Sequence, residues 1–442
     1  MPETLTLIRS KADIASAAKL NYSTSGILPT ASALAIHLGL LDEEFASEFD
    51  LNVSFARSAV STKRDSSGDG HYWIRDSDLI SAMKDRSNGS DGRLVALSFL
   101  EVSSPFVALT SSGIRSITDL KGKRLGIATT KEGFRDLGYA QQLKVYTTAL
   151  SAGGLTLHDV RFVPFETDQR SAAPFGAKSD KTKSPLEVGK DIAERLQRHE
   201  FDAIAVDLAS DVAHHVSIRV LYDSLDHPDY LARLHPNSLR GLVVSSHLLR
   251  ERGDLVARVL ARLMQAADWA KAHPKEAEDA LTESLAINLD GLTGKYRNLS
   301  EGLQINLGIE KILSLKAQKN FLLRHHLLLK NFDIDPWVDH GPLVEAHELL
   351  AEWKKDGKIE AIRPPILSHP YQLMNPPKGE LFNFNTMISP QSPDTEQSLT
   401  LEPPPQKTPD VESSNRAENS LPLVSIDPVF GHEEEEYFSF EI

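Results

Sequence analysis

The stretch Ile117–Thr129, ITDLKGKRLGIAT, decides the fold of this chain. It predicts a short helical turn, a glycine turn at Lys121-Gly122-Lys123 and a buried strand at 125–128. A long helix at 139–153 and a strand at 160–164 follow, so the region is typical of a β-α-β unit. Because parallel strands need such a helical crossover, we expect a parallel sheet here.

The same alternation of strands and helices extends in both directions from this unit. The other expected strands are 18–23, 51–55, 94–100, 106–110, 201–206 (FDAIAV) and 240–245 (RGLVVS). Helical spacing of apolar residues predicts a helix from Pro29 through Leu41, and a strongly amphipathic helix that begins at Asp254 as its N-cap. Strands that alternate with helices predict the α/β class, with sheets rich in parallel strands.

The net charge of −14 is concentrated near the C-terminus. From residue 386 onward the chain has 12 acidic and 2 basic side chains, so about −10 of the total lies there. Prolines accumulate from residue 364, and we expect 364–442 to be mostly disordered, because such a composition buries little apolar surface. Its apolar end (Tyr437, Phe438, Phe440, Ile442) could contact a protein partner; the alternative is a solvated tail.

Composition also excludes several kinds of site. The chain has no cysteine, so disulfides, thiolate metal sites and cysteine nucleophiles are excluded. The adjacent pairs His214-His215 and His325-His326 do not share a face of a helix or strand, so we expect no metal and no cofactor. No basic patch suggests nucleic acid. The N-terminal residues lack a signal-peptide pattern and no apolar run reaches membrane-spanning length, so we expect no membrane partner and a cytoplasmic protein.

Three stretches together are similar to the nitrate/sulfonate/taurine substrate-binding family. They are ITDLKGKRLGIA, FDAIAV and LRGLVVSSHLLRERGDLVARVLARLMQAADWAKAHPKEAEDAL (239–281). The resemblance implies a two-lobed, type II periplasmic-binding-protein-like fold, with a ligand cleft between the lobes. Lobe 1 would comprise 1–111 and 226–363, lobe 2 would comprise 112–225, and the tail would be 364–442.

A closer resemblance is to the desulfinase branch of that family, which hydrolyses the C–S bond of an aryl sulfinate. It is based on Tyr22-Ser23-Thr24-Ser25, VVSS at 243–246, QKNFLL at 318–323 and Asp335-Pro336-Trp337. The resemblance implies a small anionic, aromatic substrate.

The chain departs from that branch at the residues that perform the chemistry. Ser25 occupies the position of the branch's nucleophilic cysteine. Arg75-Asp76-Ser77-Asp78 occupies the position of its anion-holding Arg-x-Gly-Gly motif, and His71 matches its catalytic histidine.

The chemistry of these residues leaves alternatives open. A serine becomes a good nucleophile only when a base accepts its proton, and His71 is the available base for Ser25. Ser25 could instead donate a hydrogen bond to a ligand, or cap the helix that follows it, and His71 could belong to a surface loop. Arg75 suits a forked carboxylate, sulfonate or sulfinate, or it could pair with Asp76 or Asp78.

Lobe 2 contributes further candidates at the end of its first strand. Thr129, Thr130 and Lys131 follow that strand, and the carboxyl ends of parallel strands face the ligand in such folds. Tyr139, on the next helix, is the fourth candidate. In lobe 1, Tyr22, Ser23 and Trp73 are the corresponding ligand-binding candidates.

Two functions follow from this pattern. The first is a desulfinase-like intracellular enzyme that acts hydrolytically on a small organic anion, with Ser25, His71 and Arg75 as catalytic residues. The second is a non-catalytic protein that binds or senses a small anion on the same fold.

Overall fold

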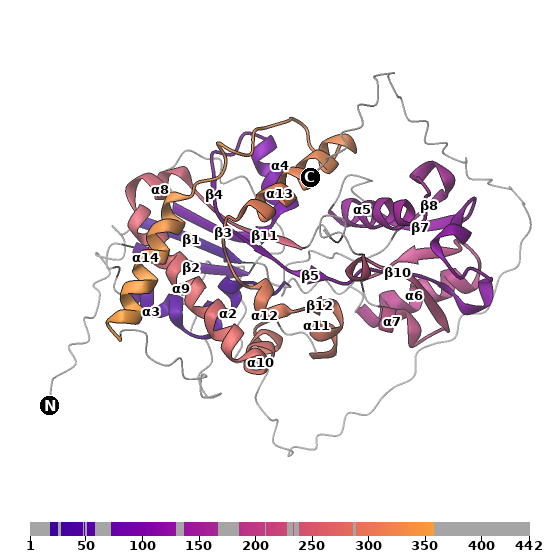
Figure 1. The fold of residues 1–442 in the computed structure, drawn as a ribbon, viewed down its shortest axis with the longest axis horizontal. Helices are drawn as coiled ribbons and strands as arrows, with labels where there is room; N and C mark the ends of the chain where they lie inside the picture. The colour runs from indigo at the N-terminus through magenta and orange to yellow at the C-terminus, as the bar shows by residue number, and fades with distance from the viewer. Residues whose placement is uncertain are drawn as a thin grey trace, which may run out of the picture. The chain divides into compact units, whose positions relative to one another are not determined.

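The computed structural model describes residues 18–24, 28–46, 48, 51–57, 72–129, 137–166, 185–207, 209–227, 233, 238–285 and 289–357. These residues form two five-stranded sheets with helices packed against them (Figure 1). We call the sheet β2-β1-β3-β11-β4 and its helices lobe 1, and the sheet β10-β6-β9-β7-β8 and its helices lobe 2. The expected α/β class and two-lobed, type II fold are confirmed. The predicted tail, 364–442, lies outside the described residues.

The strands of lobe 1 are β1 (Ala18–Thr24), β2 (Leu51–Arg57), β3 (Tyr72–Asp78), β4 (Arg93–Phe99) and β11 (Leu239–Val244). Its helices are α2 (Ala31–His37), α3 (Leu40–Ala46), α4 (Leu79–Ser87), α8 (Ser246–Glu251), α9 (Gly253–Ala272), α10 (Pro274–Leu285), α11 (Leu289–Lys295), α12 (Leu299–Gly302), α13 (Ile309–Arg324) and α14 (Gly341–Lys355).

The strands of lobe 2 are β6 (Pro105–Leu109), β7 (Arg124–Thr129), β8 (Arg161–Glu166), β9 (Ala203–Ala205) and β10 (Ile218–Asp223). Its helices are α5 (Leu137–Ala152), α6 (Pro185–Gln197) and α7 (Ala209–Ala213), with short 3-10 turns η1 (Thr110–Ser112), η2 (Ile117–Leu120), η3 (Leu157–Asp159) and η4 (Ser224–Asp226). A two-stranded ribbon of β5 (Glu101–Val102) and β12 (Tyr296–Arg297) completes the strands.

Each sheet contains one strand that is antiparallel to both of its neighbours. This strand is next to the point where the chain changes lobes. In lobe 1, β11 is antiparallel to both β3 and β4, and in lobe 2, β6 is antiparallel to both β9 and β10. The sheets are therefore mixed, although β1, β2 and β3, and likewise β7, β8 and β9, pair in parallel. The pairing also places β6 in lobe 2, whereas the boundary expected after residue 111 would leave it in lobe 1.

The stretch quoted first forms as its local chemistry predicts. Ser116 and Asp119 make a capping box at the N-terminal end of η2: the Asp119 carboxylate accepts a hydrogen bond from the backbone N–H of Ser116, and the Ser116 side chain accepts one from the backbone N–H of Asp119. Gly122 has φ +74°, a conformation that suits glycine because it has no Cβ. Arg124 then starts β7 and pairs with Asp202 beside β9 at 3.0 Å.

Two helix predictions needed correction. The helix expected from Pro29 through Leu41 is two helices, α2 and α3, because the chain turns at Gly39 with φ +74°. Asp254 does not cap α9, because the helix begins one residue earlier and Arg252 is its N-cap. The Asp254 carboxylate lies 3.5 Å from Arg252 and 3.7 Å from Arg258 instead.

Lobe 1 has helices on both faces of its sheet. On one face, α2 packs against α9, and α9 packs against α14; α4 and α13 contact β11 on the other (Figure 1). The apolar stripe expected in α9, from Leu255 through Ala267, is buried in this core. Burial of whole Leu and Val side chains contributes about 1.5–3 kcal/mol each, so α9 is a major source of lobe 1 stability.

Gly189→Ala tests the packing of lobe 2. A Cβ on Gly189 of α6 would lie 2.3 Å from the backbone oxygen of Asp211 in α7, and backbone cannot move aside cheaply. We expect the free energy of unfolding, measured in urea, to fall by about 1–3 kcal/mol. Gly253→Ala is the matched control, because a Cβ there has nothing within 4 Å, and it should not destabilise. Equal stability of the two variants would contradict the α6–α7 contact.

Candidate functional site

A buried group of polar side chains lies where β1, β3 and β11 meet. The register pairs Thr24 with Asp76, and Arg240 of β11 with Asp78. Directly opposed residues of neighbouring strands share a face of the sheet, so these side chains lie on one face. Arg240 is 1% exposed and Asp76 is 6% exposed, so both charged groups are removed from water.

Helix α2 supplies hydroxyl groups to this group of side chains. Thr30 caps α2 by accepting a hydrogen bond from the backbone N–H of Ala33 at 3.0 Å. Thr30 and Ser32 also donate hydrogen bonds to Asp76, yet burial outweighs them and raises the pKa of this carboxyl.

Arg240 is an arginine whose side chain is almost completely buried. None of its three guanidinium nitrogens has a hydrogen bond of ordinary length and angle with a residue that the structure describes. Burial lowers the pKa of the guanidinium, against the opposing effects of Tyr296, Asp78 and Asp76. Removing a guanidinium from water is costly, and Tyr296, Asp78 and Asp76 are the neighbours that offset this cost for Arg240.

Sequence reasoning did not single out Arg240 or Asp76 as site residues. A signal was present for Arg240: it is the single charged residue in LRGLVV, a strand in which every residue is buried. Arginine is rarely fully buried unless it is paired, so a charge inside an apolar strand indicates a special environment.

The predicted anion-holding residue, Arg75, is held by its own lobe. Its Nη1 donates to Asp85 Oδ2 of α4 at 3.1 Å, and its guanidinium lies 4.7 Å from the centre of the Trp73 ring. The partner is thus Asp85, and not Asp76 or Asp78 as the sequence suggested. Trp73 is 7% exposed and packs against Gly92 as well. An anion-holding role for Arg75 stays a prediction, and the structure gives it a different partner.

The other predicted residues of β1 face different environments. Tyr22 is fully buried in the lobe 1 core, where its hydroxyl hydrogen-bonds with Ser32 Oγ at 2.7 Å, and burial raises the pKa of the phenol. Ser23 donates a hydrogen bond to the Ile74 carbonyl at 3.4 Å.

Four predicted residues, Ser25, His71, Thr130 and Lys131, lie outside the described residues. Their described neighbours still inform the proposed Ser25–His71 pair. Tyr72 pairs with Leu20, whereas Thr24 pairs with Asp76. Thr24 and Tyr72 are therefore four registers, or about 13 Å, apart along the strands. The pair stays a prediction, without support from this register.

In lobe 2, Thr129 and Tyr139 are described. Thr129 ends β7 and donates a hydrogen bond to the Phe165 carbonyl at 3.2 Å, so its hydroxyl has a structural partner. Tyr139, near the start of α5, packs against the cores of both lobes, and burial raises the pKa of its phenol. Among the predicted ligand-binding residues that the structure describes, Tyr139 is thus the one packed against the cores of both lobes.

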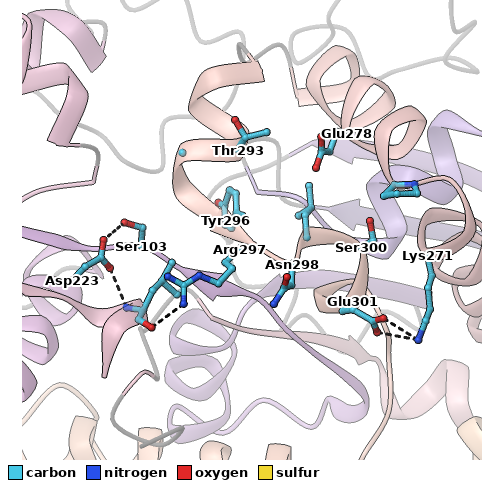
Figure 2. A pocket seen from close by; sticks show the side chains of 14 residues that line it. Ser103, Asp223, Lys271, Glu278, Thr293, Tyr296, Arg297, Asn298, Ser300 and Glu301 are labelled. Carbon is cyan, nitrogen blue, oxygen red and sulfur yellow. Dashed lines mark hydrogen bonds and ion pairs between the residues drawn. The ribbon is translucent and has the colours of Figure 1, made fainter. Parts of the chain in front are cut away.

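A separate pocket of about 740 Å³ lies beside the β5–β12 ribbon (Figure 2). Several of its charged side chains have partners in the chain: Lys271 pairs with Glu301 at 2.9 Å, and Arg297 donates to the Leu225 carbonyl at 3.0 Å. Tyr296 lines this pocket and is also an electrostatic neighbour of Arg240. The pocket contains none of the predicted site residues, and its paired charges do not indicate a ligand.

Within the described ranges there is no group of three or more residues suited to holding a metal ion. Over the same residues, no helix is both long and apolar enough to cross a membrane.

The fold defines the class of protein: a two-lobed, type II periplasmic-binding-protein fold. Solved structures that share it include a cysteine-to-serine mutant of DszB in complex with biphenyl-2-sulfinic acid, with 20% identity, a TM-score of 0.59, and coverage of 75% of this chain and 99% of that chain. The desulfurization enzyme DszB itself has 18% identity and a TM-score of 0.56, with coverage of 75% and 99%.

A third structure, named as the periplasmic sulfonate-binding protein SsuA from Methylobacillus flagellatus KT, has 11% identity and a TM-score of 0.52, with coverage of 76% and 96%. No protein-family model and no curated protein matches this sequence. The expected likeness to sulfonate-binding proteins and the desulfinase branch is thus confirmed as a likeness of fold.

Lys311 provides a pH test of how lobe 1 is packed. Burial lowers the pKa of this α13 lysine to about 8, although its Nζ donates to the carbonyls of Leu97 and Gln304. Since the folded-state pKa lies below the unfolded value, deprotonation favours the folded protein, and stability attributable to Lys311 rises with pH above about 8.

We therefore expect Lys311→Met to raise the free energy of unfolding, relative to the unaltered chain, most strongly near pH 7. This difference in stability should shrink toward pH 9.5. Urea denaturation across that range measures it. Lys316→Met, which removes an exposed ammonium paired with Asp335, controls for the loss of a positive charge. A stability difference for Lys311→Met that does not change with pH would contradict the buried-lysine assignment.

Proposed function

We propose that this protein binds a small organic anion of the sulfonate, sulfinate or carboxylate type, with Arg240 as the cation that holds it. The observation that carries the proposal is the Arg240 guanidinium, which is 1% exposed and makes no hydrogen bond of ordinary length and angle with the described residues, although Tyr296, Asp78 and Asp76 are its neighbours. A guanidinium presents a planar fork of N–H donors that matches two oxygens of such an anion. The ligand would add well-formed hydrogen bonds and a further negative charge at the guanidinium.

The position of Arg240 in the fold supports the proposal. It is the second residue of β11, the strand with which the chain returns to lobe 1 after lobe 2. Nearby, Lys295 pairs with Asp207, which follows β9 of lobe 2, at 3.4 Å. Residues of both lobes therefore meet close to the Arg240 region. Ligands of open α/β sheets bind at the strand edge where topology changes, which is the edge that Arg240 occupies.

The proteins of similar fold suggest the class of anion. One structure is a complex with biphenyl-2-sulfinic acid, and another is named as a sulfonate-binding protein. Both groups carry negative charge on oxygens bound to sulfur, and a carboxylate has the same forked geometry. Arg240 suits any of the three.

Desulfinase-like hydrolysis is the second candidate, with Ser25 as nucleophile, His71 as base and Arg75 as anion holder. The likeness in fold to DszB favours it. Two observations favour binding instead: Arg75 pairs with Asp85, and the residues beside Ser25 and His71 are about 13 Å apart in register. The cytoplasmic location and a partner for the acidic tail stay predictions.

Arg240→Gln tests the binding function. We expect titration calorimetry with benzenesulfonate, benzenesulfinate, benzoate and ethanesulfonate to detect binding of at least one by the unaltered protein. Removal of the buried cation should then weaken the binding of that ligand by at least about thirtyfold. Arg161→Gln, at an exposed position of β8, is the matched control and should bind as the unaltered protein does. Unchanged affinity in Arg240→Gln would contradict the proposal.

Sulfite release separates binding from hydrolysis. We expect the protein to be stabilised against heat by biphenyl-2-sulfinate or a related anion, as a ligand that binds the native state must do, without releasing sulfite. Ser25→Cys restores the residue of the desulfinase branch, and His71→Ala removes the proposed base. Sulfite release by the unaltered protein that His71→Ala abolishes would establish hydrolysis and overturn the non-catalytic function.

A further inference from the structure

Helix α5 of lobe 2 meets the C-terminal end of α13 of lobe 1 through side chains. The Lys144 ammonium of α5 lies 5.4 Å from the centre of the Phe321 ring, which is a cation–π distance. Phe321 in turn packs against His325, with 4.6 Å between the ring centres. Ala140, one turn before Lys144, is 0% exposed and belongs to the lobe 1 core. We call Lys144, Phe321 and His325 the α5–α13 contact.

The charged groups that act on His325 among the described residues are all basic. His325 is the C-cap of α13, and its backbone N–H donates to the Phe321 carbonyl at 3.1 Å, so its position at the helix end is fixed. Its charged neighbours are Arg324 and His326 in lobe 1, and Lys144, which is the one charged residue of α5. Burial lowers the pKa of His325, and these three bases lower it further. A protonated His325 therefore repels lobe 2 through Lys144.

The direction of this pKa change links the lobe contact to pH. An ordinary histidine has a pKa of about 6.5, so its charge changes near neutral pH. Because the contact lowers the pKa of His325, this histidine binds a proton more weakly when the lobes touch than when they are apart. Proton binding therefore favours separation. The effect begins as the pH falls through about 6.5, and it is complete below the lowered pKa.

We propose that the α5–α13 contact is a pH-sensitive switch between the lobes. With His325 neutral, the Lys144 ammonium rests over the Phe321 ring and the helices stay together; with His325 protonated, like charges drive α5 away from α13. This inference is independent of the proposed function, because it involves neither Arg240 nor an anion. Hinge motion of two lobes needs only such a small bias between two arrangements.

The distance between the lobes tests the proposal directly. The chain has no cysteine, so two introduced cysteines can be spin-labelled without interference. Ser151→Cys on α5 and Ala272→Cys on α9 place one label at an exposed position of each lobe. Double electron–electron resonance then measures the distance between the labels at pH 8 and at pH 5. We expect a severalfold larger population at the longer distances at pH 5, and an unchanged distance distribution would overturn the proposal.

His325→Phe in the labelled protein identifies the group that titrates. Phenylalanine keeps a ring against Phe321 but takes no proton, so the distances at pH 5 should stay those of pH 8. His347→Phe, at an exposed histidine of α14, is the matched control and should keep the full response. A response that survives in His325→Phe would show that another group is responsible, and the switch would be rejected.

Lys144→Gln distinguishes repulsion between the lobes from a local change at the end of α13. This variant removes the cation of α5 and leaves Arg324 and His326 in place. The response to pH should shrink strongly, because a protonated His325 then has no charge on α5 to repel. A response as large as that of the unaltered protein would place its origin within lobe 1 and overturn the proposal. If His325→Phe does not fold, Lys144→Gln carries the test alone.

Discussion

The structure depends on one constraint: each sheet includes an antiparallel strand, β6 or β11, that the chain adds next to a crossing between the lobes. Strand β6 runs antiparallel within the lobe 2 sheet just after the chain leaves lobe 1, and β11 does the same within lobe 1 after the chain returns. Neither five-stranded sheet is complete until the chain has crossed. The crossing also puts the first residues of β11, including Arg240, next to the carboxyl end of β3, where Asp76 and Asp78 lie.

The electrostatics of this buried region centre on Arg240 and its neighbours. Thr30 and Ser32 hydrogen-bond to Asp76, and burial raises the pKa of that carboxyl. Tyr296 adds a favourable neighbour without a well-formed hydrogen bond. An enclosed guanidinium is costly to remove from water, and under the proposed function a forked anion would add charge balance and hydrogen bonds at Arg240.

This chain shares its fold with a desulfurization enzyme, while its Arg75 has local partners of its own. The fold is shared over almost the whole length of DszB. Within that framework, Arg75 is bound to Asp85 and stacked over Trp73, which makes it part of the contact between β3 and α4. Under the proposed function, the cation that holds the anion belongs to β11 instead. A shared fold does not require that the same residues hold a ligand.

The sequence by itself determined the local elements and the two-lobed class, because capping boxes, glycine turns and apolar periodicity act over a few residues. The capping box at Ser116, the turn at Gly122 and the buried stripe of α9 formed as these patterns predict. Only the tertiary structure decided which sheet β6 joins, which carboxylate Arg75 finds, and which arginine is left without a partner. Those outcomes depend on strands and helices far apart in sequence, and the pairing of a buried charge is set by what folding brings beside it.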